Sequence, residues 1–234
     1  MQKKDKIYEG KAKILYTTDD PALLIQYFKD DATAFNAQKR GTIEGKGVMN
    51  NRIAARIFEY LGKAGVATHF VQLLSEREML IKKVEIVPIE VIVRNRAAGS
   101  LCRLLGLREG LHLACPVLEF CFKKDELGDP LINEYHIRAL NLATDEEIKK
   151  ISSSTFHVNT LLKKFFLKLN IELIDFKLEF GRYKGDIILA DEISPDTCRL
   201  WEVGTGNKLD KDRFRRDLGN IEEAYKEVLR RVSQ

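Results

Sequence analysis

Six residues in the last third of the chain, Asp-Phe-Lys-Leu-Glu-Phe, alternate strictly between charged and apolar side chains. Successive side chains of a β-strand point to opposite faces, so this period places Asp175, Lys177 and Glu179 together on one face. The following Gly-Arg-Tyr-Lys-Gly is typical of a turn, and residues 186–190 (Asp-Ile-Ile-Leu-Ala) have the character of a returning strand. The pattern therefore predicts a hairpin that brings Asp191 back beside the charged face.

Glu179 and Asp191 are candidate ligands of a magnesium ion. Mg²⁺ takes oxygen ligands, and proteins commonly bind it through one or two carboxylates together with substrate phosphates. Lys177 lies between these carboxylates on the predicted face and is suited to bind an anion. A solvated face of an antiparallel hairpin accounts for the same residues equally well, so the hairpin alone does not assign a function.

Charge and glycine are also concentrated in other parts of the chain. These are residues 8–13 (Tyr-Glu-Gly-Lys-Ala-Lys), 28–36 leading to 45–51 (Gly-Lys-Gly-Val-Met-Asn-Asn), and 88–100. A further charged segment, residues 191–201, follows the predicted hairpin. In the first segment, glycine lets backbone N–H groups approach a polyphosphate, and its two lysines alternate with apolar neighbours so that both can point towards it. The alternative is a pair of ordinary surface lysines.

Arg94 and Ser100 bracket the tripeptide Ala-Ala-Gly at the entry of a predicted short helix. A helix N-terminus, a glycine and an arginine together commonly hold a phosphate monoester. The alternative, equally compatible with the pattern, is a buried Arg94 that pairs with Glu90 on the same strand face.

In their order and spacing, these segments resemble the SAICAR synthetase family, the phosphoribosylaminoimidazole-succinocarboxamide synthases of purine biosynthesis. The match runs from about residue 8 to residue 219, nearly the whole chain. The segments Pro-Ile-Glu-Val-Ile-Val-Arg-Asn-Arg-Ala-Ala-Gly-Ser and Asp-Phe-Lys-Leu-Glu-Phe-Gly are long and specific. The chain departs from the family at residues 102–104 (Cys-Arg-Leu), where many relatives carry a Lys-Arg pair, so one positive charge is missing here.

The resemblance implies a role for each residue that matches a family motif. Residues 10–13 correspond to the ATP-phosphate loop, and Arg94, Ser100 and Arg199 to the site of the substrate's ribose phosphate. The full set comprises the ATP-binding residues Gly10, Lys11, Ala12, Lys13, Ile81, Lys82 and Val84, the substrate-binding residues Glu90, Arg94, Ser100, Lys123, Asp129, Asp175, Asp196, Arg199, Lys211 and Arg215, and the catalytic residues Lys177, Glu179 and Asp191, the last two as metal ligands.

For some of these residues, the residue type and spacing support an interpretation independent of the resemblance. Asp196 is suited to accept hydrogen bonds from ribose hydroxyls. Lys211 and Arg215 are four positions apart, which places them on one face of a helix, where a solvated, salt-bridged surface is nearly as well supported as ligand binding. Residues 123–130 have the composition of a polar turn.

The activity that the resemblance implies is that of an ATP-dependent ligase with Mg²⁺ and ATP as cofactors. It joins the carboxylate of carboxyaminoimidazole ribonucleotide (CAIR) to the amine of L-aspartate, giving SAICAR, ADP and phosphate. A kinase with a similar two-lobed ATP site is the alternative. A nucleotide-sensing module is a third, but it could dispense with the two metal-binding carboxylates.

Composition is consistent with small anionic substrates and does not indicate nucleic-acid binding. The 234 residues carry a formal net charge of +4, and the longest basic cluster, at 208–216, is interrupted by aspartates. Four cysteines without Cys-x-x-Cys spacing predict neither disulfides nor zinc, which favours a reducing cytoplasm. We expect no targeting segment, membrane or nucleic-acid partner, and the resemblance allows a homodimer.

The elements predict an α+β protein with two lobes. Strands are expected at 13–17, 22–28, 66–76, 78–84 and 84–93, and helices at 46–60, 97–105, from the capping box at 144–147 to 170, and after residue 220. Strands thus cluster early and helices late. We expect a β-rich ATP-binding lobe at 1–85 and an α+β substrate-binding lobe at 86–234, with ATP between them as in the family fold.

Overall fold

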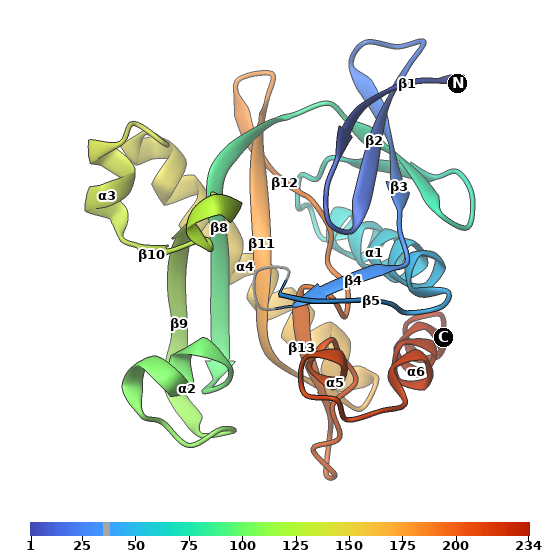
Figure 1. Cartoon of the computed structure of the whole chain (residues 1–234). Helices are drawn as coiled ribbons and strands as arrows, with labels where there is room; N and C mark the ends of the chain where they lie inside the picture. Colours follow the sequence, from blue (N-terminus) through green and yellow to red (C-terminus); the bar gives the residue numbers. More distant parts are fainter. Residues whose placement is uncertain (35–37) are drawn as a thin grey trace.

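The computed structural model describes residues 1–34 and 38–234. Within this range the strands form a five-stranded, a six-stranded and a two-stranded sheet (Figure 1). The end of segment 28–36, which was singled out in the sequence, lies outside the described residues. None of the helices in the described ranges is long and apolar enough to cross a membrane.

The first sheet is antiparallel and belongs to the N-terminal part of the chain. Helix α1 (Lys46–Lys63) packs against it and confirms the predicted helix, three residues longer than expected. The strands predicted at 13–17, 22–28 and 78–84 are confirmed as well. Across the sheet the order is β1 (Lys3–Glu9), β2 (Lys13–Thr18), β3 (Leu23–Phe28), β7 (Glu78–Lys82) and β6 (Phe70–Leu73), and β4 (Asp31–Ala34) pairs with β5 (Lys39–Thr42) beside it.

The second sheet is also antiparallel and is built around one long strand, β11 (Ile171–Tyr183), which pairs with β8, β12 and β13. It contains β8 (Glu85–Arg96), β9 (His112–Phe122), β10 (Leu131–Ile132), β12 (Asp186–Ala190) and β13 (Cys198–Glu202). The expectation that strands cluster early is therefore wrong, because this sheet lies in the later part of the chain. The α+β class is confirmed.

The predicted hairpin is present as β11 and β12, and its register pairs Glu179 with Ala190, directly before Asp191. The turn is shorter than predicted, because β11 continues to Tyr183 and only Lys184 and Gly185 connect the strands. Both turn residues have positive φ, 51° and 83°, as a two-residue hairpin turn of type I′ requires.

Gly181 lies inside the strand and not in the turn. A Cβ added there would come within 2.5 Å of Val84 Cγ2, so glycine permits a close approach between β11 and the chain just before β8.

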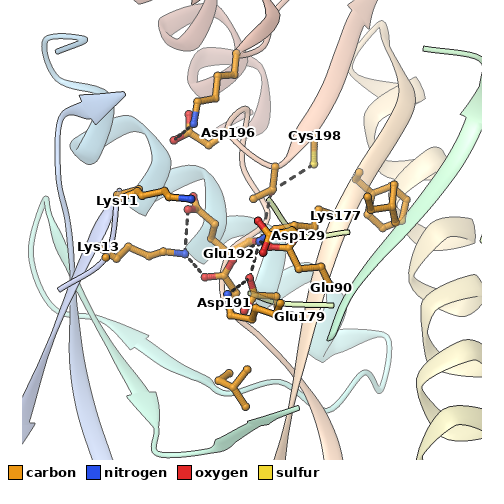
Figure 2. A pocket seen from close by; sticks show the side chains of 18 of the residues that line it. Lys11, Lys13, Glu90, Asp129, Lys177, Glu179, Asp191, Glu192, Asp196 and Cys198 are labelled. Carbon is orange, nitrogen blue, oxygen red and sulfur yellow. Dashed lines mark hydrogen bonds and ion pairs between the residues drawn. The ribbon is translucent and has the colours of Figure 1, made fainter. Parts of the chain in front are cut away.

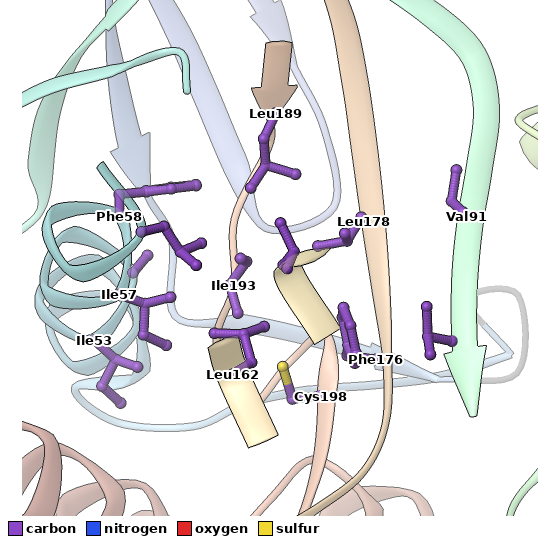
Figure 3. Close-up of a cluster of buried hydrophobic side chains, with 14 of the residues drawn as sticks. Ile53, Ile57, Phe58, Val91, Leu162, Phe176, Leu178, Leu189, Ile193 and Cys198 are labelled. Carbon is purple, nitrogen blue, oxygen red and sulfur yellow. The ribbon is translucent and has the colours of Figure 1, made fainter. Parts of the chain in front are cut away.

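The core lies on the apolar face of β11. Phe176 and Leu178 point into one buried cluster with side chains of α1 and α4 (Figure 3), and Phe180 belongs to the same cluster. Burying each such side chain contributes about 1.5–3 kcal/mol. The close-packed apolar cluster on one face of β11 therefore fixes the position of the charged face on the other side.

Six helical elements complete the fold: α2 (Ser100–Leu105), the 3₁₀ turn η1 (Asp125–Leu127), α3 (Glu134–Ala139), α4 (Asp145–Lys168), α5 (Asp212–Arg215) and α6 (Ile221–Val232) within the described ranges. The Thr144 capping box forms as predicted, with Glu147 bonding back to the Thr144 N–H. The break between β7 and β8 coincides with the boundary that we predicted near residue 85, and the division into two functional lobes stays a prediction.

Candidate active site

A cavity of about 710 Å³ lies between the two large sheets. It is lined from the first sheet by β2, β3 and β7, and from the second by the charged face of β11 and its neighbours. The structure brings every site residue named from the sequence to this cavity. These are Gly10, Lys11, Ala12, Lys13, Ile81, Lys82, Val84, Glu90, Arg94, Ser100, Lys123, Asp129, Asp175, Lys177, Glu179, Asp191, Asp196, Arg199, Lys211 and Arg215.

The glycine loop at 10–13 reaches across the cavity through its two lysines. Lys13, at the start of β2, forms ion pairs with Asp191 and, at 3.1 Å, with Glu192. Burial disfavours its charge, but these carboxylates outweigh burial and raise the pKa of Lys13 above its ordinary value. Lys11 extends instead to Asp125 of η1, at 2.7 Å. Both lysines thus have acidic partners, and Figure 2 shows Lys13 with Asp191 and Glu192.

Lys177 lies at the centre of a carboxylate cluster on the second sheet (Figure 2). Its Nζ is 2.9 Å from Glu90, 2.5 Å from Glu179 and 3.7 Å from Asp191. Burial alone would lower its pKa, but the surrounding carboxylates raise the pKa of Lys177 well above its ordinary value. Lys123 adds a second ammonium group, 2.9 Å from Glu179. The cluster therefore brings ammonium and carboxylate groups into direct contact at the cavity.

Asp191 is held ionised by its neighbours. Burial disfavours its charge, but Lys13 and Lys177 outweigh burial and keep its pKa below the ordinary value. Its backbone has φ of 62°, a left-handed conformation that non-glycine residues adopt rarely and often at functional sites.

The two carboxylates fit a magnesium ion whose other ligands come from substrate phosphates and water. Glu179 and Asp191 line the same cavity and contact the same ammonium group, that of Lys177. Among the described residues, no three His, Cys, Asp or Glu side chains form a group that could hold a metal on their own. Mg²⁺ suits such a site because it usually retains waters and binds through one or two carboxylates plus phosphates.

Arg94, on β8, lines the same cavity. It is 2% exposed and donates to Asp175 at 2.8 Å, to Glu119 at 2.7 and 2.8 Å, and to the Ser100 hydroxyl at 2.7 Å. Pairing of Arg94 with Glu90, the alternative left open above, is wrong: strand β9 supplies Glu119 instead, and Glu90 accepts from Lys177.

Arg199 approaches the same point from β13. Its guanidinium donates to Asp175 at 2.8 Å and to Asp212 at 2.9 Å. Gly99, before α2, has φ of 56°, and a Cβ there would lie 2.5 Å from Arg199 Nη2. Glycine is thus required both by the backbone conformation and by the position of the arginine. Asp175 Oδ2 joins the two arginines of the region.

The remaining substrate residues border this region. Asp196 lies 3.7 Å from Lys211 Nζ, and Arg215 donates to Asp212 at 2.7 Å. Burial lowers the pKa of Lys211 despite the nearby Asp196. Asp129 accepts from the Lys124 N–H at 2.8 Å, which shapes the polar turn at 123–130.

The opposite end of the cavity is more apolar. Ile81 and Val84 line it together with Leu15 and Leu24, and Lys82 donates to the Thr68 carbonyl at 2.8 Å.

Three functional candidates were missed in the sequence. Glu192 pairs with Lys13, and its position next to Asp191 was a usable signal. Lys46, in the glycine-rich segment 45–51, contacts Asp196. His69 lines the cavity with both ring nitrogens unpartnered among the described residues, and burial lowers its pKa to about 3. A lone histidine carries no such signal in sequence.

Comparisons with known proteins identify the family of the chain. The family model described as SAICAR synthetase matches residues 6–232. A phosphoribosylaminoimidazole-succinocarboxamide synthase of Caldanaerobacter subterraneus subsp. tengcongensis is 60% identical over 234 residues, covering 100% of both chains. The solved structure of the synthase of that name from Ehrlichia chaffeensis has a TM-score of 0.96 at 45% identity, covering 98% of each chain. A SAICAR synthetase (Type-2) in complex with ADP has a TM-score of 0.94 at 48% identity, covering 97% of each chain. The chain belongs to the SAICAR synthetase family.

Proposed function

We propose that this protein is an ATP-dependent ligase that joins the carboxylate of CAIR to the amine of L-aspartate, giving SAICAR, ADP and phosphate. The observation that carries the proposal is the placement of two regions suited to bind phosphate in one cavity. The lysines of residues 10–13 lie at one, and Arg94, Ser100 and Arg199 at the other. The cluster around Lys177 lies on the second sheet and lines the same cavity.

ATP occupies the side of the cavity formed by the first sheet. Its adenine lies against the apolar end formed by Ile81 and Val84, near Lys82, and its phosphates lie at Lys11 and Lys13. The complex of a family member with ADP supports the use of this nucleotide. On entry, the phosphates replace carboxylates as the partners of both lysines.

CAIR occupies the side formed by the second sheet. Its phosphate binds at Arg94, Ser100 and Arg199, because guanidinium groups and a hydroxyl donor suit a phosphate monoester. Asp196 then accepts hydrogen bonds from the ribose hydroxyls. The imidazole end of the substrate points towards Lys177, while Lys123, Asp129, Lys211 and Arg215 border the bound molecule and the aspartate.

The chemistry requires activation of a carboxylate, which is a poor acyl donor because the leaving group would be oxide. A carboxylate oxygen of CAIR attacks the γ-phosphorus of ATP, the P–O bond to ADP breaks, and an acyl phosphate forms. The amine of aspartate then attacks the carbonyl carbon, the C–O bond to phosphate breaks, and the nitrogen loses a proton. Lys177 binds the carboxylate and then the acyl phosphate, since its charge is permanent at neutral pH.

Glu179 and Asp191 would hold Mg²⁺ beside the phosphates. When bound, the ion would neutralise negative charge on the transferring phosphoryl group. The two carboxylates supply oxygen ligands, and Lys13 and Lys177 keep Asp191 in the ionised form that binds a cation.

Release of ADP from purified protein with ATP, Mg²⁺ and CAIR, measured with and without L-aspartate, tests the proposal. We expect aspartate-dependent ADP release together with a new succinylated product. ADP release that is indifferent to aspartate would contradict the ligase and indicate a kinase. No ADP release at all would contradict both.

We further propose that the enzyme works in the cytoplasm as a homodimer, with a β-rich lobe of residues 1–85 and a substrate-binding lobe of residues 86–234. The family resemblance supports the dimer, and the unpaired cysteines are compatible with a reducing compartment. Light scattering on the purified protein tests the dimer, because a mass near 26.8 kDa would identify a monomer.

A further inference from the structure

Two buried side chains donate hydrogen bonds to the carboxylate of Asp196. Lys46 Nζ donates to Oδ2 at 2.7 Å, and the Tyr225 hydroxyl donates to Oδ1 at 2.6 Å. Lys46 is 1% exposed and Tyr225 0%, so both contacts are shielded from water. The described residues that line the cavity include Asp196 and its ion-pair partner Lys211, but neither of these two hydrogen-bond donors.

The two partners come from distant parts of the chain. Lys46 opens α1 and Tyr225 lies within α6, two helices that pack against each other (Figure 1). Asp196 follows β12, in the loop that leads to β13. The contact therefore joins the helix pair to the loop that borders the substrate region.

Stability is a weak explanation for this arrangement. Removing two charges from water offsets most of their attraction, so apolar residues of similar size often replace a buried ion pair without loss of stability. Such a pair is more readily explained where a charge must be kept in one position at a binding surface.

The chemistry of Asp196 indicates what that position is for. Burial disfavours its charge, but Lys211 and Lys46 outweigh burial and hold its pKa below the ordinary value. An ionised carboxylate only accepts hydrogen bonds, and its two oxygens have about four acceptor positions. One on each oxygen is taken by Lys46 and by Tyr225. At least one position on each oxygen therefore remains for a ligand with neighbouring hydroxyl donors.

We propose that Lys46 and Tyr225 are positioning residues that fix the Asp196 carboxylate for the ribose hydroxyls of CAIR. The inference rests on the proposed function, which supplies the ribonucleotide. With either donor removed, the carboxylate is hydrogen-bonded at one oxygen only, although Lys211 still lies 3.7 Å from Oδ2, and its alignment with the two hydroxyls is lost.

The Tyr225→Phe variant tests this with the smallest change, because only the hydroxyl is lost. We expect the KM for CAIR to rise about tenfold, with the KM for ATP unchanged and kcat within about twofold of wild type. Lys46→Met is a second variant of similar length and has the same expected selectivity. Tyr60→Phe, which removes a hydroxyl bonded to the Leu161 carbonyl, and Lys226→Met, on the exposed side of α6, are matched controls.

A substrate analogue separates positioning from a merely structural role. Binding of CAIR and of its 2′,3′-dideoxy analogue is measured by calorimetry for wild type and each variant. Wild type should prefer CAIR, and Tyr225→Phe should lose most of that preference, because the hydroxyls no longer meet an aligned acceptor. Equal weakening of both ligands would overturn the proposal.

The proposed function is checked separately. Wild-type turnover of CAIR and aspartate is measured first, so failure of the proposed function is detected before any variant is compared. If wild type turns over CAIR but binds the dideoxy analogue equally well, the proposal for Lys46 and Tyr225 is overturned while the ligase assignment stands.

Discussion

Lys13 of the first sheet forms an ion pair with Asp191, which directly follows β12 of the second sheet. The pair joins the proposed phosphate loop to a proposed metal ligand without any bound molecule. Each group therefore keeps the other charged in a buried place. ATP with Mg²⁺ offers each group a new partner of opposite charge. A phosphate can replace Asp191 beside Lys13, and a metal ion can replace Lys13 beside Asp191. The cavity is electrostatically prepared for its ligands.

Replacement of the proposed metal ligands should abolish turnover. We expect Glu179→Gln and Asp191→Asn to lower kcat/KM by about a hundredfold or more, because a neutral amide neither binds Mg²⁺ well nor balances the lysines. Aspartate-dependent ADP release over a range of Mg²⁺ concentrations measures this.

Glu172→Gln is the matched control for that experiment. Glu172 lies on the same strand and pairs with Arg96 outside the cavity, so its loss should leave turnover near wild type. The metal assignment is wrong if Glu179→Gln or Asp191→Asn, with an unchanged thermal midpoint, keeps wild-type activity.

Gly99→Ala should damage both stability and substrate binding. The backbone at φ 56° is costly for alanine, and the added methyl group would displace the guanidinium of Arg199. We expect a loss of about 1–3 kcal/mol in the free energy of unfolding and a higher KM for CAIR. Denaturant unfolding and steady-state kinetics measure the two effects. Gly62→Ala, in α1, where the new Cβ would meet no atom within 4 Å apart from its chain neighbours and the backbone of its own helix, should instead be neutral or stabilising.

His69 should make stability depend on pH. Its pKa is about 3 in the folded protein and about 6.5 in an unfolded chain, so the unfolded state binds more protons between these values. The free energy of unfolding should therefore rise with pH across this window, by up to about 1.4 kcal/mol per pH unit from this group. His69→Phe keeps an aromatic ring beside Phe58 and should flatten the rise. An equally steep rise in the variant would assign the dependence to other groups.

Local patterns predicted the elements that hold most of the site. The alternation around Lys177 identified β11 and its charged face, and the Thr144 capping box identified the start of α4. Both signals are reliable because strand alternation and helix capping depend on residues that are close together in the sequence.

Features that depend on pairing between distant segments were not predictable in the same way. Strand β9 was missed because Pro116 interrupts its pattern, close to an irregularity in its pairing with β8. Its Glu119 therefore could not be foreseen as a partner of Arg94. We assigned Gly181 to a turn, but in the structure it makes room for the side chain of Val84. The sequence alone does not distinguish these two reasons for a glycine. The contact of Lys46 with Asp196 joins distant parts of the chain, so it could not be predicted from the sequence.

Lys11 and Asp125 should separate ligand binding from stability. Their side chains are 40% and 66% exposed, so the ion pair between them contributes little, within about 1 kcal/mol, to the free energy of unfolding. Asp125→Asn should leave the thermal midpoint nearly unchanged, and the KM for ATP should stay equal or fall slightly, because Lys11 loses a competitor for phosphate. Lys11→Met should raise the KM for ATP about tenfold at equal stability, since a charge-assisted contact to phosphate is lost. The two variants would have opposite or unequal effects on ATP despite removing the same ion pair. A matching rise in KM in both would show that the contact acts by closing the cavity, and the assignment of Lys11 to phosphate would then be wrong.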